Sequence, residues 1–453
     1  MKTHSLRLVT LAVCCATFAG AQSTPPPTDD TRLKQVIIFG RHGVRSSVVP
    51  AAVLNTFAAL PYPPFTAAPP PASVPLPTEG FLTVNGAAME TTLGGYYRLW
   101  LTSEGLLTGH DAADASFFYF HANNIERTIL TAQSLWTGML PGGGPPNVSA
   151  APQGSRDPLF DPVGAGVAQI DVQKAAAAVN GRLGGNPQAL ASAYASEYAL
   201  IRSVLFDYPA DTLTPPPAPA GKVDVTAIPI QVAAGTPASP VSFGGLAYVN
   251  YAVDGFVMEY ADGFAPSDVG WGLLNAAGVS QTLRILNLVQ DLNVRTPYVD
   301  GVLSSNVASH LVRSLVQAAT GNAIPGSLGT PSTKVIGLIA SDNNILGLAG
   351  LFHLDWIVPG YQQDFAAPGG ALVFELRQSQ RTGEYLVRTS YVVQTLDQLR
   401  NRTILTLSSP PARAPVFIPG CSVGNATFDC PLAAFVKLAS RVIDPLSADR
   451  TNE

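Results

Sequence analysis

Three apolar segments, each followed by a polar turn and a helix, most strongly constrain the fold of this chain. Runs of β-branched and aromatic residues lie at 35–40, 117–120 and 335–339, and the 3.6-residue periodicity of a helix follows the second and third. Strands that alternate with helices indicate an α/β fold, because parallel strands need crossover connections. Ligands of such folds bind beyond the carboxyl ends of the strands, which is where we expect the functional site.

The other segments indicate the domain organisation. Residues 170–206 are Ala-rich and helical, and the Pro-rich stretch 207–242 is expected to form a long loop or a lid. Residues 371–376 and 385–393 flank a polar turn and predict an antiparallel hairpin. We therefore predict an α/β core, with a mostly parallel sheet flanked by helices, and an inserted smaller helical cap domain. The expected divisions are a signal peptide (1–21), the first part of the core (22–140), a helical cap with Pro-rich loops (141–250) and the second part of the core (251–453).

The amino terminus predicts export. Lys2 and Arg7 precede the apolar stretch 8–18, and Ala19-Gly20-Ala21 is a small-residue cleavage site. That stretch is too short to span a bilayer, and no later segment offers about 18 uninterrupted apolar residues. We expect a periplasmic or secreted protein that is not embedded in a membrane. A lipoprotein attached through Cys14 is the weaker alternative.

The cysteines and the charge narrow the range of partners. Cleavage would leave Cys421 and Cys430, which in an oxidising compartment most simply form a disulfide, with two free thiols as the alternative. No histidine cluster accompanies them, so no metal site is expected. The formal net charge of -5 argues against a nucleic-acid partner, because such proteins usually have a basic face. The oligomeric state is not indicated.

Charged residues gather at the three strand ends, and their chemistry suggests a phosphate site. Guanidinium groups placed together repel one another unless a dianion such as phosphate lies between them. A neutral imidazole can attack phosphorus, arginines can stabilise the transition state, and a carboxylic acid can protonate the leaving alkoxide. This chemistry needs no cofactor and implies an acidic optimum. The candidate residues are His42 as nucleophile, Asp342 as proton donor, and Arg41, Arg45, Arg127 and Ser341 as phosphate-binding residues.

The same motifs resemble those of the histidine acid phosphatases, a branch of the phosphoglycerate mutase-like superfamily that includes bacterial phytases and periplasmic glucose-1-phosphatases. Arg41-His42-Gly43-Val44-Arg45 is similar to the RHGxR signature of that family, and Glu126-Arg127-Thr128 resembles the element with its third phosphate-binding arginine. The resemblance covers most of the mature chain, weakly through 140–245. It implies a phosphoglycerate mutase-like core beneath a helical domain, and it implies the roles given above for the histidine, the aspartate and the three arginines.

One departure from the family pattern lies beside the proposed acid. The family has histidine directly before the catalytic aspartate, whereas this chain has Ser341, which can donate a hydrogen bond but carries no charge. Loss of a charge-assisted donor raises a transition state by about 2 to 4 kcal/mol. His310 and His353 are more simply helix residues than replacements, and His121 is more simply a strand-end residue.

A second departure lies at the rim of the site. Val48 and Val49 follow the signature, where phytase-like members often carry a basic residue, so we expect a less charged monoester than phytate, such as a sugar phosphate. Asp254 is a candidate pocket carboxylate, with a solvated helix face as the alternative. We predict a phosphatase acting on a small phosphomonoester. The alternatives are an inactive binder of phosphorylated ligands and, as a third option, a phosphate mutase.

Overall fold

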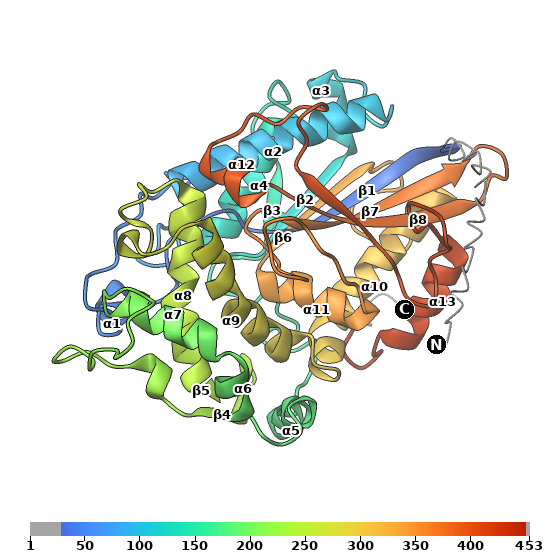
Figure 1. Ribbon diagram of the computed structural model, residues 1–453. Coiled ribbons are helices and arrows are strands. Elements are labelled where there is room, and N and C mark those ends of the chain that lie inside the picture. Colours follow the sequence, from blue (N-terminus) through green and yellow to red (C-terminus); the bar gives the residue numbers. More distant parts are fainter. Residues whose placement is uncertain (1–28, 450–453) are drawn as a thin grey trace, which may run out of the picture.

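The computed structural model describes residues 29–449, which form a sheet of eight strands flanked by helices (Figure 1). The predicted signal peptide at 1–21 lies outside the described residues. The predicted α/β class is confirmed. Along the sheet the strands follow the order β10 (Cys430–Pro431), β8 (Tyr385–Val393), β7 (Ala371–Ser379), β1 (Thr31–Arg41), β6 (Val335–Ala340), β2 (Phe118–Ala122) and β3 (Val148–Ala150), and β9 (Ala412–Val416) pairs with β8.

The sheet is mixed, with a parallel half and an antiparallel half. β1 pairs in parallel with β6, β6 with β2, and β2 with β3. The predicted hairpin of β7 and β8 adds antiparallel strands on the other side of β1, so the sheet is less uniformly parallel than the sequence indicated. The three strands predicted from apolar runs are therefore neighbours, and their carboxyl ends lie at one edge.

The central strand β1 is apolar from residue 36 to residue 40 because both of its faces are buried there. Val36 and Ile38 pack in a core with α2 (Val84–Ser103) and α4 (Glu126–Met139). Ile37 and Phe39 point to the opposite face, which is covered by α10 (Val299–Thr320) and α11 (Asp342–Phe352) (Figure 1). Burial of each such side chain stabilises the fold by about 1.5 to 3 kcal/mol. An unbroken apolar run is the pattern that two buried faces require.

Helices α2 and α4 approach each other closely because glycines lie in their contact. A Cβ atom on Gly94 would overlap the carbonyl group of Leu135, and one on Gly138 would overlap the carbonyl oxygen of Thr91. This close packing fixes α4 against the sheet, so the first turn of α4 lies at the carboxyl edge of the parallel strands.

The segment between β3 and α10 forms a mainly helical part beside that edge of the sheet (Figure 1). Residue 250 lies inside α8, and the division of the chain into domains stays a prediction. The helices of this part are α5 (Val172–Arg182), α6 (Ala189–Ala193), α7 (Ala195–Leu205), α8 (Gly245–Asp262) and α9 (Ala276–Val294).

The Pro-rich stretch predicted as a loop or lid contains a β-hairpin. Strands β4 (Ile230–Thr236) and β5 (Ser239–Gly244) pair in antiparallel fashion as a separate two-stranded sheet. Its prolines lie before β4, in the turn and in β5, positions that a two-stranded sheet tolerates. The remaining short elements are α1 (Ala51–Leu54), α3 (Asp111–Asp114), α12 (Leu396–Arg400), α13 (Leu432–Val442) and the 3₁₀ turns η1 (Ala115–Phe117), η2 (Val225–Ala227) and η3 (Val269–Gly272).

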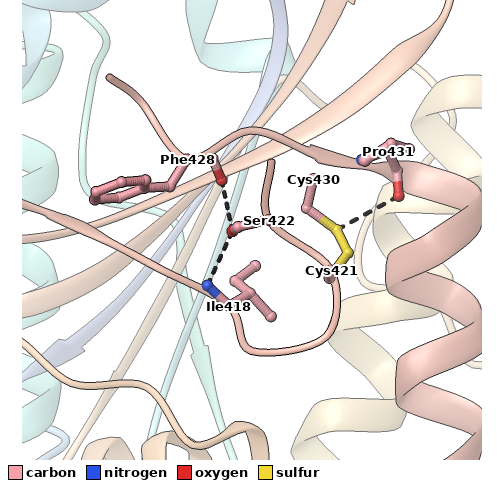
Figure 2. Close-up of a disulfide and its surroundings, with 6 residues drawn as sticks. All are labelled: Ile418, Cys421, Ser422, Phe428, Cys430 and Pro431. Carbon is pink, nitrogen blue, oxygen red and sulfur yellow. Dashed lines mark hydrogen bonds between the residues drawn. A yellow bond between two sulfur atoms is a disulfide. The ribbon is translucent and has the colours of Figure 1, made fainter. Parts of the chain in front are cut away.

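A disulfide joins Cys421 to Cys430, as predicted (Figure 2). Their Cα atoms lie 5.2 Å apart. Inside the loop that they close, the hydroxyl of Ser422 donates to the carbonyl oxygen of Phe428 at 2.6 Å and accepts from the backbone N–H of Ile418 at 2.9 Å. Because Cys430 begins β10 and α13 follows directly, the bridge secures this strand and helix at the edge of the sheet.

Across residues 29–449, no helix is both long enough and apolar enough to cross a membrane.

Candidate active site

The carboxyl ends of β1, β6 and β2 bring the predicted residues to one place. The backbone N–H of His42 donates to Ala340 at 2.9 Å, and that of Asn123 donates to Ile339 at 2.9 Å, so the three strand ends are linked side by side. A cavity of about 620 Å³ lies beyond them. Arg41 is buried behind it as the last residue of β1. The predicted residues that line the cavity are His42, Arg45, Arg127, Ser341 and Asp342.

His42 is held in the form that a nucleophile requires. Its Nδ1 lies 2.9 Å from the carbonyl oxygen of Gly43. A carbonyl oxygen can only accept, so Nδ1 carries the proton and Nε2 keeps its lone pair. Burial holds the pKa of His42 well below its ordinary value, and the charges of Arg127, Arg41 and Arg45 lower it further. The imidazole therefore stays neutral in mildly acidic solution.

The three arginines each keep at least one buried donor without a hydrogen-bond partner among the described residues. Arg41 donates from Nη1 to the carbonyl oxygen of Ala366 at 2.6 Å, and Arg127 donates to that of Gly80 at 3.3 Å. The Nε atoms of Arg41, Arg45 and Arg127 are buried, and within residues 29–449 none has a hydrogen-bond partner. A buried donor without a partner costs about 1 to 3 kcal/mol, which a bound phosphate would offset.

The charges in this cluster also favour an anion. Burial lowers the pKa of Arg127 to about 10, and the charges of Arg45 and Arg41 add to that effect while the carboxylate of Asp342 opposes it. Such mutual repulsion is relieved when a dianion lies among the guanidinium groups. The geometry thus indicates a phosphate-binding position next to the free nitrogen of His42.

Asp342 is the carboxyl group at this position. Its Oδ2 lies 3.0 Å from Nη2 of Arg41 and accepts a hydrogen bond from Nε2 of Gln290 at 2.7 Å. Its Oδ1 accepts one from the backbone N–H of Asn343 at 2.9 Å. The side chain remains 16% exposed, so it can reach a ligand in the cavity.

Ser341 lies at the N-terminal cap of α11. The three histidines that could have compensated for it, His121, His310 and His353, do not line the cavity formed by the described residues. The hydroxyl of Ser341 donates to Oδ1 of Asn344 at 2.8 Å. His310 bonds a loop carbonyl through Nδ1, and His353 ends α11 in a left-handed conformation with φ of 53°. His121 lies between Ser149 and Asp157. Among the described residues, no imidazole other than His42 lines the cavity to replace the family histidine.

Asp254 belongs to the site, and the alternative of a solvated helix face is wrong. Asp254 lies on α8 and is 6% exposed. Its two carboxylate oxygens accept hydrogen bonds from Nη1 and Nη2 of Arg45, at 2.7 and 3.0 Å. Burial alone would raise the pKa of Asp254, but the Arg45 charge and hydrogen bonds hold it below its ordinary value. This bidentate pair fixes the guanidinium of Arg45 beside His42.

Away from the phosphate position the cavity wall carries no further cation among the described residues. The hairpin of β4 and β5, which sequence reasoning missed, supplies part of this wall, and α8 and α9 supply much of the rest. This part of the wall consists of apolar side chains and of polar side chains without charge. Representative lining residues are Val48, Val49, Val241, Phe243, Asn250, Tyr251, Leu286, Val289 and Asn293.

Glu90 lies behind the loop that carries His42, and it was also missed. It is 2% exposed, and a Cβ atom on Gly43 would lie 2.8 Å from its Oε1. Burial raises the pKa of Glu90 to about 8. The sequence did contain a signal for its burial. Glu90 lies three positions before Leu93 and seven before Tyr97, so helical periodicity places it on the apolar face of α2.

Fold and site together define the class, an α/β protein with buried guanidinium groups beside an unprotonated imidazole nitrogen. The comparisons with known proteins show what the chain is similar to. A family model, "Histidine phosphatase superfamily (branch 2)", matches residues 32–203. This result confirms the resemblance drawn from the sequence motifs.

Curated relatives and solved structures match nearly the whole chain. Glucose-1-phosphatase of Providencia rettgeri is 26% identical over 97% of this chain and 99% of its own length. Phytase AppA of Escherichia coli is 28% identical over 94% of this chain and 95% of its own. The Hafnia alvei phytase structure, at 28% identity, superposes with a TM-score of 0.80 over 93% of this chain and 99% of its own. The predicted enzyme class, a phosphoric monoester hydrolase of the histidine acid phosphatase family, is confirmed.

Proposed function

We propose that this chain hydrolyses phosphomonoesters through a phosphohistidine intermediate. The observation that carries the proposal is the convergence of three unpartnered guanidinium Nε donors on a histidine whose Nε2 keeps its lone pair. The arginines would hold the ester phosphate and stabilise the charge that develops on its equatorial oxygens. No step of this chemistry needs a group from outside the chain except the ester and water.

In the first step, Nε2 of His42 attacks phosphorus while the bond between phosphorus and the ester oxygen breaks. The leaving alkoxide takes a proton from the carboxylic acid of Asp342. In the second step, water attacks phosphorus and gives a proton to the Asp342 carboxylate, the bond from phosphorus to Nε2 breaks, and phosphate leaves. The enzyme returns to its initial protonation state, with neutral His42 and protonated Asp342.

The cavity wall suggests which ester is used. A substrate with several phosphates would leave all but one of them against valines, amides and hydroxyls, without a cation to offset their desolvation. A single phosphate on an uncharged, hydroxyl-bearing group fits the wall better. We therefore propose a small monoester such as a sugar phosphate as the substrate, in line with the relatives that are glucose-1-phosphatases. The sequence of residues 1–21 further leads us to propose that the enzyme acts in the periplasm or outside the cell.

A second candidate function rests on Ser341. Its hydroxyl is engaged with Asn344, so the phosphate position lacks the charge-assisted donor expected from the family. A protein with this deficit could bind phosphate esters and turn them over very slowly. Retention of both His42 and Asp342 at the site favours the hydrolase.

The test is phosphate release by residues 22–453 from p-nitrophenyl phosphate, glucose 1-phosphate and phytate, between about pH 3 and 7. We expect activity that is highest in acid, greater on glucose 1-phosphate than on phytate, and lost in His42→Asn. The matched control is His121→Asn, which changes a histidine away from the cavity and should retain activity. Activity that survives in His42→Asn would refute the phosphohistidine route, and no activity with intact ester binding would establish the second candidate.

A further inference from the structure

We infer that Gln290 is a positioning residue that fixes the proton-donating carboxyl group of Asp342. This inference rests on the proposed function. Gln290 comes from α9, in the helical part between β3 and α10, whereas Asp342 begins α11 directly after β6. No motif links the two residues, so only the folded structure brings them together.

The contact between them is short and buried. Nε2 of Gln290 donates to Oδ2 of Asp342 at 2.7 Å, and Gln290 is 6% exposed. A carboxylate oxygen only accepts, so the amide nitrogen and not the amide oxygen faces Asp342. The same Oδ2 lies 3.0 Å from Nη2 of Arg41. One hydrogen bond from Gln290 and an ion pair with Arg41 therefore hold this oxygen of the carboxyl group.

This arrangement decides which oxygen carries the proton. A proton on Oδ2 would meet the N–H of Gln290 and the positive charge of Arg41, whereas Oδ1 accepts a single hydrogen bond within residues 29–449, from the backbone N–H of Asn343. The proton of the acid therefore belongs on Oδ1, and Oδ1 is the atom that transfers it to the leaving group. Without Gln290, Oδ2 would lose its hydrogen bond and keep only the ion pair with Arg41, so the carboxyl group would be held less firmly in this orientation.

An amide suits this position better than a second cation would. Arg41 already places one positive charge beside Asp342, and a general acid must be protonated before it acts. The neutral amide of Gln290 orients Asp342 without adding to that charge. Gln290 thus holds the carboxyl group in place while leaving it able to carry a proton.

The other atom of the amide indicates more than a packing role. Oε1 of Gln290 is buried and has no hydrogen-bond partner within residues 29–449, although the side chain lines the cavity. Buried amide oxygens in structural positions nearly always have partners. The hydroxyl of the departing alcohol, or the water that later attacks phosphorus, can supply the missing donor to this amide oxygen.

The test uses the dependence of the rate on the leaving group. An alkyl phosphate such as 2-glycerophosphate needs a proton on its leaving alkoxide, whereas p-nitrophenolate is a weak base and leaves without one. The measured quantity is kcat/KM, because it covers the steps up to formation of the phosphohistidine and excludes its hydrolysis. In Gln290→Leu we expect kcat/KM to fall about 10- to 100-fold on the alkyl ester, and by no more than about threefold on the aryl ester.

The matched control is Asn293→Leu, on the same helix. Asn293 also lines the cavity but makes no hydrogen bond to Asp342 in the described part of the chain, so its variant should change both substrates by the same factor. If Gln290→Leu does not fold, as judged by circular dichroism, Gln290→Met keeps the length of the side chain and gives the same test. Equal loss on both esters, or no loss on either, would overturn the inference. Failure of the proposed function would appear separately, as activity that survives in His42→Asn.

Discussion

Glu90→Gln should remove a large part of the pH dependence of the stability of this protein. Glu90 is buried on α2 behind the catalytic loop, and burial raises its pKa from 4.5 to about 8. Between pH 4.5 and about pH 8, the folded protein keeps a proton on Glu90 that the unfolded chain releases. The free energy of unfolding therefore falls as the pH rises. Glutamine has nearly the same shape and cannot ionise, so the variant lacks this contribution.

The magnitude follows from the two pKa values. Each pH unit between them corresponds to about 1.4 kcal/mol, so the interval of about 3.5 units gives at most about 5 kcal/mol. The contribution is complete below pH 4.5 and is lost as the pH approaches 8. Burial also raises the pKa of Glu259 to about 7 and that of Asp300 to about 6. Both groups contribute equally to the wild type and to Glu90→Gln, so their contributions cancel when the two pH profiles are compared.

The assay is urea denaturation of the wild type and of Glu90→Gln at about pH 5 and pH 8, followed by circular dichroism. We expect the wild type to lose several kcal/mol more than the variant between the two conditions. Glu384→Gln, an exposed change in the turn between β7 and β8, should behave as the wild type does. Parallel pH profiles for the wild type and Glu90→Gln would refute the argument that Glu90 is protonated in the folded state.

Three further changes test other parts of the molecule. Ser341→His should raise kcat/KM about tenfold or more, because an imidazolium adds a charge-assisted donor, and an unchanged value would contradict a deficit at this position. Arg127→Ala should weaken competitive inhibition by inorganic phosphate about 10- to 100-fold, whereas Arg98→Ala, bonded to an aspartate outside the cavity, should not. Reduction of Cys421–Cys430, which are 9 positions apart, should lower the free energy of unfolding by about 2.5 kcal/mol in urea denaturation, and no change would show that β-pairing alone holds β10.

The strands of the core and most of the site could be predicted because their signals are local. An apolar run followed at once by Arg41 or Ser341 identifies both a buried strand and the side chains at its end. The order of strands could not be predicted, since nothing in the sequence shows that β6 inserts between β1 and β2. The prolines of 229–240 hid the β4–β5 hairpin, because they interrupt the alternation by which strands are recognised.

The parts of the site that were missed or left undecided come from helices distant in the sequence. Asp254 and Gln290 are single polar residues in helical segments, where a polar residue most often marks a solvent-exposed position. Their partners Arg45 and Asp342 lie 209 and 52 residues away in the chain. Such pairs follow from tertiary packing alone, so periodicity and motifs gave no means of finding Gln290 and left Asp254 undecided.

The position of β1 in the sheet has a consequence for how the chain folds. Its neighbours are β6 and β7, in which Val335 pairs with Val36 and Phe374 pairs with Ile37. At ordinary translation rates about 300 residues take some 15 to 60 s to synthesise, and through that time β1 has neither partner. An apolar strand with two open edges can pair with another chain. The segment that ends in the catalytic loop is thus also the one most in need of protection from aggregation before the last strands arrive.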